Sequence, residues 1–600
     1  MVDTVAGSPQ QVKVRSFGLS RDDSLIGLLL LIVVVVGGYF RFIGQNWDEY
    51  TLWHPDERFL TQVVASLGGP LAFTDSDIAG KTALCLERYP ETGGRGGFFD
   101  AACSPLNPNN TGNGLYVYGT LPAFLVRGTA DTLAQLTGDT NWSSYYGGRQ
   151  VGRLLSAVAE IGVILTTFLI GLRLHGKWVG LLAAVLYCCT VFSIQQAHFW
   201  TADAISNFMV ALAILGAVRI QTGGKLGSYL FCGLFCGAAL ASRINTAPVI
   251  GLLLLAVGMR LLPVLNGRLA WNVRGQLLAN ALMGVTMALL LAFLTFRVLN
   301  PYAFSGPGFF GLSLNPGWLQ DAGEAQHLVS GNAESPPNWQ WASRTAYLFP
   351  LSNMVLWGMG IALGLTAWGA WAVSGWQLIR GRQNALRNLL LFVWVLVYFA
   401  WLGRLWVMTM RYYLPMYPVL AVLAAWALVA LVRWANKSPR VGLRLASRSL
   451  LLVVVGFTAV WAMMFTNIYR SMFAPAQSTH WVADNLPGDF SMQIDGENAP
   501  LINISMYHPQ LGRDVPLDQQ AARYEEGQVY SQVFTAPADG DITKIHAPHL
   551  GDPNDDSGTE TLRIRISVPD GNLVLAEGVL TADLKRDEHV LGSAYDIPLS

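Results

Sequence analysis

The stretch from Ser24 to Phe42 reads SLIGLLLLIVVVVGGYFRF and carries one charged residue, Arg41, near its end. An apolar run of roughly 20 residues can cross the hydrocarbon core of a bilayer as a helix. This run is longer than the apolar segment of a signal peptide, and no small-residue cleavage site follows it. The stretch therefore predicts a retained transmembrane helix.

The composition extends this prediction to the whole chain. Of the 600 residues, 52% are hydrophobic and 13% are charged, about half the roughly 25% typical of soluble domains. The 39 basic and 39 acidic residues cancel, and the mean hydropathy is +0.37. These values exclude a disordered chain, a coiled coil and a nucleic-acid-binding protein that works through a basic surface. The 20 Trp and 20 Tyr suit aromatic belts at the membrane interfaces.

Ten further segments have the length and apolar character of membrane spans. They cover residues 150–172, 178–196, 204–220, 226–242, 246–262, 277–297, 347–376, 388–406, 413–432 and 450–468. The segment 115–136 is interrupted by Pro122, Arg127 and Asp131, so we predict a helix that lies along the membrane interface. The expected fold class is an all-α polytopic membrane protein with eleven transmembrane helices.

The basic residues indicate the orientation of these spans. A cytoplasmic N-terminus places 18 Lys and Arg residues in cytoplasmic segments: Lys13, Arg15, Arg21, Arg173, Lys177, Arg219, Lys225, Arg260, Arg268, Arg274, Arg380, Arg382, Arg387, Arg433, Lys437, Arg440, Arg444 and Arg448. The short outer loops hold few. By the positive-inside rule, this predicts a multi-pass protein of the plasma or inner membrane whose C-terminus lies outside.

The same map divides the chain. Residues 1–23 form a cytoplasmic tail, residues 24–474 form the membrane domain, and residues 44–149 and 298–346 form its long outer loops. Residues 475–600 are rich in Asp, Pro and Gly, and Leu562–Ile566 alternates with the period of a strand. A turn signal, Pro569-Asp570-Gly571-Asn572, follows. We expect an external all-β domain there, and its end after a strand-like stretch leaves its completeness open.

The six cysteines fall into two groups. Cys188, Cys189, Cys232 and Cys236 lie in predicted helices, where buried apolar packing is the favoured interpretation. Cys85 and Cys103 both lie in the first outer loop, in a compartment that permits disulfides. A bond between them would close a loop of about 18 residues, worth about 3 kcal/mol. No cysteine spacing matches a zinc site.

An acidic motif follows the first span. It is His54-Pro55-Asp56-Glu57, in which Pro55 suits the start of a helix and the two acids suit its first turn. An ordinary helix start would explain the motif. The functional interpretation is a carboxylate held at the membrane surface to take a proton from an acceptor hydroxyl.

A second acidic motif runs from Gln195 to Asp203 and includes His198. Polar residues between two apolar spans are costly beside lipid, so this cluster predicts a functional cavity. As an alternative, Asp203 could be the N-cap of the helix that follows.

Two arginines also lie at predicted outer ends. They are Arg243, in Ser242-Arg243-Ile244-Asn245, and Arg411, in Met410-Arg411-Tyr412. A guanidinium group there could bind a phosphate through two parallel hydrogen bonds. The alternative is an arginine that reaches toward lipid headgroups.

Together these motifs resemble the GT-C superfamily of integral-membrane glycosyltransferases. The motifs are His54-Pro55-Asp56-Glu57, the His198 to Asp203 turn, and Arg411-Tyr412-x-Leu-Pro, with support from Tyr118–Pro122, Gly148-Arg149, Gly152–Ser156 and Asn300–Phe304. The bacterial protein O-mannosyltransferases and aminoarabinose transferases, the family 39-like enzymes, are most similar. The resemblance covers residues 24–470 and excludes the β domain.

This resemblance implies a hexosyl- or pentosyltransferase. Its sugar donor would be a polyprenyl-phosphate sugar bound from within the bilayer, and its acceptor would be a protein, lipid or glycan on the outer side. Asp56 matches the family's catalytic acid, with Glu57 in support. Arg411 and Tyr412, and less directly Arg243, would bind the carrier phosphate. Many relatives carry Lys in place of Arg243.

The resemblance also implies a second acidic site. Asp203 matches an acid that helps to hold a metal in some relatives, and His54 and His198 lie beside it in the motifs. Relatives differ in their need for a divalent metal, so the cofactor stays open. No Walker A or Rossmann glycine pattern is present in the sequence, in keeping with a lipid-linked donor.

Two other classes of protein compete with this interpretation. A lipid or sugar transporter would favour charges at mid-membrane and repeated halves, whereas here the charges cluster at the predicted outer ends and no repeat is visible. A non-catalytic membrane assembly protein would tolerate the loss of Asp56 and Arg411. Within the enzyme class, hydrolysis of the lipid-linked sugar also stays open.

The orientation can be tested by cysteine accessibility. We expect single cysteines at Ser16 and Ser557 to be labelled from opposite sides of the membrane, because the basic residues gather on one side. Labelling of both positions from the same side would contradict the eleven-span map.

Overall fold

The computed structural model describes most of the chain. It covers residues 21–49, 51–74, 78–265, 271–331, 336–382, 384–471, 473–478, 490–495, 501–504, 525–536, 538–552, 558–569, 571, 573–585 and 592–600. The chain divides into two units, Met1–Phe473 and Ala474–Ser600. Four predicted positions, Lys13, Arg15, Ser16 and Ser557, lie outside the described residues, as does Arg268.

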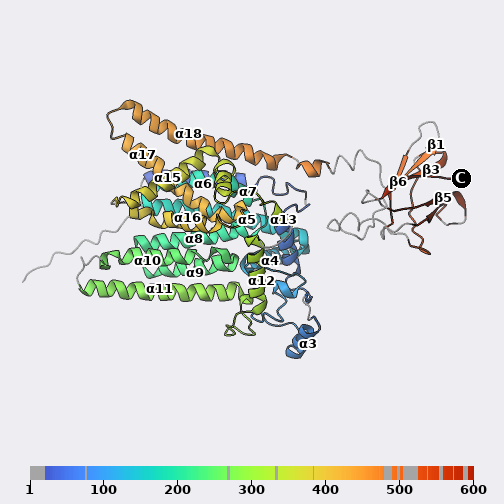
Figure 1. Ribbon diagram of the computed structural model, residues 1–600, viewed down its shortest axis with the longest axis horizontal. Helices are drawn as coiled ribbons and strands as arrows, with labels where there is room; N and C mark the ends of the chain where they lie inside the picture. The colour runs from blue at the N-terminus through green and yellow to red at the C-terminus, as the bar shows by residue number, and fades with distance from the viewer. Residues whose placement is uncertain are drawn as a thin grey trace, which may run out of the picture. The chain divides into compact units, whose positions relative to one another are not determined.

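The first unit is helical (Figure 1). Its α-helices are α1 (Arg21–Phe42), α2 (Pro55–Ser66), α3 (Ile78–Arg88), α4 (Thr120–Thr137), α5 (Tyr145–His175), α6 (Lys177–Cys188), α7 (Val191–Gln196), α8 (Ala202–Thr222), α9 (Leu226–Ser242), α10 (Val249–Leu265), α11 (Trp271–Leu299), α12 (Pro316–Ser330), α13 (Pro336–Trp339), α14 (Leu348–Asn353), α15 (Ile361–Ile379), α16 (Leu389–Leu402), α17 (Tyr417–Ala435) and α18 (Val441–Thr466). The short turns between them are η1 (Pro90–Thr92), η2 (Pro108–Asn110), η3 (Thr140–Ser143), η4 (Ile244–Thr246), η5 (Pro301–Ala303), η6 (Met354–Gly358), η7 (Ala385–Asn388), η8 (Met410–Met416) and η9 (Asn467–Arg470).

Within the described residues, eight helices are long and apolar enough to cross a membrane. Each coincides with a predicted span, which confirms the multi-pass helical class. The other three predicted spans fall on shorter or interrupted elements. The segment 178–196 is split into α6 and α7 at Cys189–Thr190, 226–242 is the short helix α9, and 347–376 is divided among α14, η6 and α15. The number eleven stays a prediction.

Small residues set the spacing of the helices around α9. A side chain on Gly233 would overlap the backbone of Ala288, and one on Gly237 would overlap the backbone of Ala292. These glycines let α9 approach α11 closely, as small residues do between membrane helices. On its other side α9 contacts α8, which in turn packs on α5.

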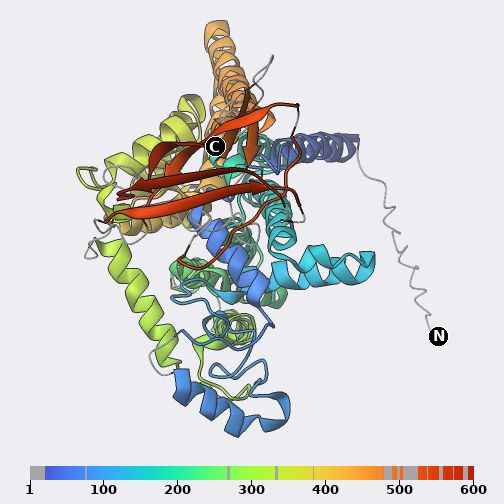
Figure 2. The ribbon, with the colours of Figure 1, turned by 90° about the vertical axis from the view of Figure 1, so that its right-hand side faces the viewer.

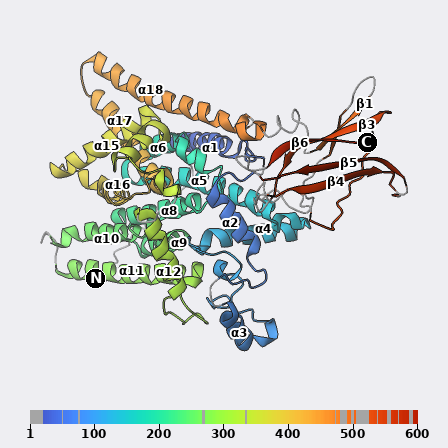
Figure 3. The ribbon, with the colours of Figure 1, turned by 45° about the vertical axis from the view of Figure 1, so that its right-hand side comes forward.

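The segment predicted to lie along the membrane interface forms the helix α4, which contacts α2, and α2 packs on α5 (Figure 3). Elsewhere in this loop, Cys85 of α3 is joined to Cys103 by a disulfide, the pair predicted from the sequence. Asp100 lies beside it, fully buried, and accepts hydrogen bonds from Arg88 at 3.0 Å and from the Tyr89 hydroxyl at 2.8 Å. The disulfide and the buried carboxylate together fix the fold of this loop.

The second unit is built from strands, as predicted (Figure 2). The strands are β1 (Phe490–Asp495), β2 (Leu501–Ile504), β3 (Asp541–Leu550), β4 (Glu560–Ser567), β5 (Val574–Ala582) and β6 (Ser593–Pro598). All pairs are antiparallel, in one sheet of order β2-β1-β3-β6 and a second sheet of β4 and β5. The alternating stretch Leu562–Ile566 lies in β4. Of the predicted turn, Asp570 and Asn572 lie outside the described residues.

Removal of the disulfide should loosen the first outer loop. We expect Cys85→Ser to speed proteolysis between residues 70 and 105, because a bridge closing a loop of this length is worth about 3 kcal/mol. Limited proteolysis with peptide mapping measures the effect, and Cys232→Ser, a buried free cysteine of α9, is the control. Equal digestion rates for wild type and Cys85→Ser would contradict the expectation.

Candidate active site

The site begins at the first turn of α2. Pro55 is its first residue, as the sequence predicted, and His54 is its N-cap. The two acids that follow point in different directions, since consecutive residues of a helix are about 100° apart. The side chain of Asp56 is 22% exposed, whereas that of Glu57 is completely buried.

Glu57 belongs to a closed network of ion pairs. Its two carboxylate oxygens accept hydrogen bonds from Nε and Nη2 of Arg153 at 2.6 and 2.7 Å. The same guanidinium group donates to both oxygens of Asp48 at 3.0 and 2.9 Å, and Arg149 donates to Asp48 at 2.9 Å. The backbone N–H of Trp200 donates to Glu57 at 2.8 Å. Glu57 therefore has no free side toward a substrate.

The two carboxylates and the two guanidinium groups of this network balance in charge, and all four side chains are buried. Burial raises the pKa of Asp48, but the arginines beside it outweigh this effect and hold the pKa below its ordinary value. Sequence reasoning gave no role to Asp48 and cited Arg149 and Arg153 only as parts of motifs. The available signal was their spacing of four residues, which places two arginines on the same face of an otherwise apolar helix.

A second set of charges is open to a ligand. Asp56 is ion-paired with Arg411 of η8, and Asp203, in the first turn of α8, is ion-paired with Arg243, which follows α9. Both guanidinium groups lie near the ring of Tyr412, at 5.8 Å for Arg411 and 5.3 Å for Arg243. The four predicted residues Asp56, Asp203, Arg243 and Arg411, from distant parts of the chain, thus lie together around Tyr412, which was also predicted. Side-chain exposures of 20% for Arg411 and 13% for Arg243 leave both within reach of a ligand.

Several polar atoms around these pairs have no hydrogen-bond partner in the described part of the chain. They are Nδ1 of His54, Oδ2 of Asp203 and Nε of Arg411, all of them buried. Burial and the charge of Arg411 lower the pKa of His54, so its ring is neutral at pH 7. Because buried polar groups are normally hydrogen-bonded, these atoms indicate a place for a polar ligand.

The predicted metal residues are arranged differently. The ring of His198 stacks on Tyr469 at 3.5 Å, and its nitrogens each lie 2.8 Å from a backbone carbonyl oxygen, of Ile194 and Ile43. Burial lowers its pKa to about 4. The described residues contain no group of three His, Cys, Asp or Glu side chains that could hold a metal ion. With Asp203 already paired to an arginine, this donor set does not fit a resident metal.

The alternative role of Asp203 as an N-cap is wrong. Thr201 is the N-cap of α8, and Asp203 lies inside the first turn. In that position its carboxylate faces Arg243 while the N-terminus of the helix adds a favourable dipole.

Comparisons with known proteins complete the description. No family model and no curated protein matches the chain. Among solved structures, the apo oligosaccharyltransferase of Archaeoglobus fulgidus is 14% identical in sequence. The match has a TM-score of 0.49 and spans 86% of this chain and 62% of the oligosaccharyltransferase. The complex of the A. fulgidus oligosaccharyltransferase AglB with an inhibitory peptide and a dolichol-phosphate is 14% identical, covering 78% of this chain and 58% of its own, with a TM-score of 0.46.

A third structure is ArnT from Cupriavidus metallidurans bound to undecaprenyl phosphate. It is 15% identical, covers 78% of this chain and 81% of its own, and has a TM-score of 0.41. At 14–15% identity, these are similarities of fold. The chain spans less than two thirds of the oligosaccharyltransferase.

Glu57→Gln should destabilise the protein. Removing one charge of a buried ion pair leaves the other uncompensated, at a cost of about 3–5 kcal/mol. We expect a clear fall in melting temperature of the purified protein. The matched control is Asp131→Asn, which breaks a partly exposed pair with Arg127, of a kind worth about 0–1 kcal/mol. Equal melting temperatures for the two variants would contradict a structural role for Glu57.

Proposed function

We propose that the chain is a glycosyltransferase that moves a sugar from a polyprenyl-phosphate carrier to a hydroxyl of an acceptor on the outer face of the membrane. The observation that carries this proposal is the two carboxylate–guanidinium pairs beside Tyr412, in which both guanidinium groups are partly exposed. The motif resemblance in the same residues supports it. A protein, lipid or glycan could supply the hydroxyl.

Arg411 and Arg243 are the proposed binding groups for the carrier phosphate. In the transfer the bond between the anomeric carbon and the phosphate oxygen breaks, and the electron pair leaves with the phosphate. Negative charge therefore grows on the leaving group, and fixed cations beside it lower the barrier. Arginine suits this task because its planar group donates two parallel hydrogen bonds to phosphate.

Asp56 is the proposed general base. As the acceptor oxygen bonds to the anomeric carbon, its proton passes to the carboxylate of Asp56. In the structure this carboxylate is paired with Arg411. A phosphate that takes over the donors of Arg411 would release Asp56, so that the base becomes available when the donor is bound.

Glu57 has a different task in this proposal. Its contacts with Arg153 and Trp200 make it a positioning residue that fixes the first turn of α2 and hence the direction of Asp56. We also assign a positioning role to Asp203, which holds Arg243 in place. The Asp203–Arg243 ion pair is less exposed than the Asp56–Arg411 pair, so Asp203 is the less accessible of the two carboxylates.

Asp56→Asn should remove turnover and leave folding intact. The amide keeps the shape of the side chain but lacks a basic oxygen, so we expect transfer to fall by about 10²–10⁴-fold, the usual worth of a positioned base. The measurement is in vitro transfer from synthetic polyprenyl-phosphate sugars, with melting temperature as the folding control. Asp131→Asn on α4 is the matched variant and should keep its activity. Transfer near the wild-type rate by Asp56→Asn would falsify the assignment of the base and move it to Asp203.

A further inference from the structure

Tyr118 is part of a sequence motif, Tyr118–Pro122, to which the proposed reaction gives no task. The centre of its ring lies 5.4 Å from the guanidinium carbon of Arg243, and the ring centre of Tyr412 lies 5.3 Å from the same atom. Two aromatic rings therefore lie next to a guanidinium group that is also ion-paired with Asp203. Aromatic rings attract such a group through its charge and through its flat faces.

Gly119 brings the ring of Tyr118 to this arginine. The N–H group of Gly119 donates to the carbonyl oxygen of Ser242, the last residue of α9, at 3.1 Å. A side chain on Gly119 would overlap the backbone oxygen of Ala241, so only glycine permits this approach. Arg243 directly follows α9. The backbone contact of the motif and the ring contact of its tyrosine thus involve neighbouring residues.

Tyr118 also contacts the helix that carries the proposed base. Its ring centroid lies 6.4 Å from that of Phe59, which follows Asp56 by three residues on α2 and so projects from the same side of that helix. The ring of Tyr116 lies 6.0 Å from that of Tyr118, and its hydroxyl donates to the carbonyl oxygen of Gly119 at 3.0 Å. The buried ring of Tyr118 is therefore held between α2 and the end of α9.

We propose that Tyr118 is a positioning residue for the transfer reaction, an inference that rests on the proposed function. Its ring orients the guanidinium group of Arg243, so that two N–H groups face the carrier phosphate in parallel. Because Tyr118 is buried, it acts on the donor through Arg243. Its contact with Phe59 links the orientation of this cation to the helix of the base, Asp56.

A double-mutant cycle tests this role, with undecaprenyl phosphate as the probe and the purified protein in lipid nanodiscs. We expect Tyr118→Leu to weaken binding by about tenfold, the scale of one cation–π contact shielded from water. In an Arg243→Gln background the same substitution should change binding by less than about twofold, because the group that it orients is gone. Tyr118→Phe keeps the ring and should bind like wild type.

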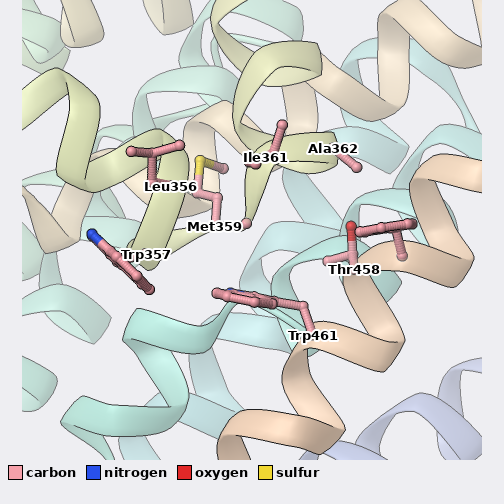
Figure 4. Close-up of a pocket in the computed structure, with 9 residues that line it drawn as sticks. Leu356, Trp357, Met359, Ile361, Ala362, Thr458 and Trp461 are labelled. Atoms are coloured by element: carbon pink, nitrogen blue, oxygen red, sulfur yellow. The ribbon is translucent and has the colours of Figure 1, made fainter.

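An aromatic residue away from the site serves as the matched control. Trp357 of η6 lines an apolar cavity of about 160 Å³ between the η6–α15 connection and α18 (Figure 4). No charged residue and none of the groups around Arg243 lines this cavity. Trp357→Leu therefore removes a ring without touching the proposed phosphate site, and it should leave the binding of undecaprenyl phosphate unchanged.

The outcomes separate this inference from the proposed function. If Tyr118→Leu weakens binding equally in both backgrounds, or in neither while Arg243→Gln does, the positioning role is overturned and the phosphate site stands. If neither Arg243→Gln nor Arg411→Gln weakens binding, the proposed phosphate site itself fails. Should Tyr118→Leu not fold, Arg243→Lys takes its place, since lysine keeps the charge but lacks the flat group. We expect a similar tenfold loss from Arg243→Lys, and wild-type affinity would overturn the positioning role.

Discussion

The guanidinium group of Arg153 holds two carboxylates, of Asp48 and Glu57, in a place that solvent does not reach. A charge in such a place must be paired, since an unpaired one costs several kcal/mol. This requirement ties the connection after α1, the first turn of α2 and the N-terminal third of α5 into one arrangement. It also fixes which acid of α2 faces inward, and its neighbour Asp56 is then turned toward the opening.

The two kinds of ion pair in this unit differ in what they allow. The pair of Glu57 and Arg153 is sealed, with 0% and 1% of the side chains exposed, and breaking it would strand a charge. The pair of Asp56 and Arg411 is about one fifth exposed, so water screens it and an exchange of partners costs little. An arriving phosphate can therefore compete for Arg411 but not for Arg153. The sealed pairs supply rigidity, and the more exposed pairs are those to which we assign the proposed chemistry.

Much of this arrangement could be predicted from local sequence. Apolar runs gave eight spans that coincide with helices, and Pro55 marked the start of α2. The sequence could not show that the span 178–196 is broken at Cys189–Thr190, because apolar residues on both sides hide the break. Nor could it assign Arg153 to Glu57, since partners 96 residues apart depend on helix packing rather than on spacing. For the same reason, the sequence motif could not separate Glu57 from Asp56, because adjacency in sequence does not show that the two side chains point in different directions.

The open ion pair has a consequence for the order of events in the proposed reaction. While Arg411 occupies the carboxylate of Asp56, the base is partly neutralised and cannot readily take a proton from water or from an acceptor. Binding of the carrier phosphate shifts the guanidinium group to a stronger, doubly hydrogen-bonded partner. In the proposed reaction, the same event anchors the leaving group and frees the carboxylate of Asp56, which takes the proton of the attacking acceptor hydroxyl. In this proposal, donor binding and base activation are coupled through Arg411, so transfer begins only when the sugar donor is bound.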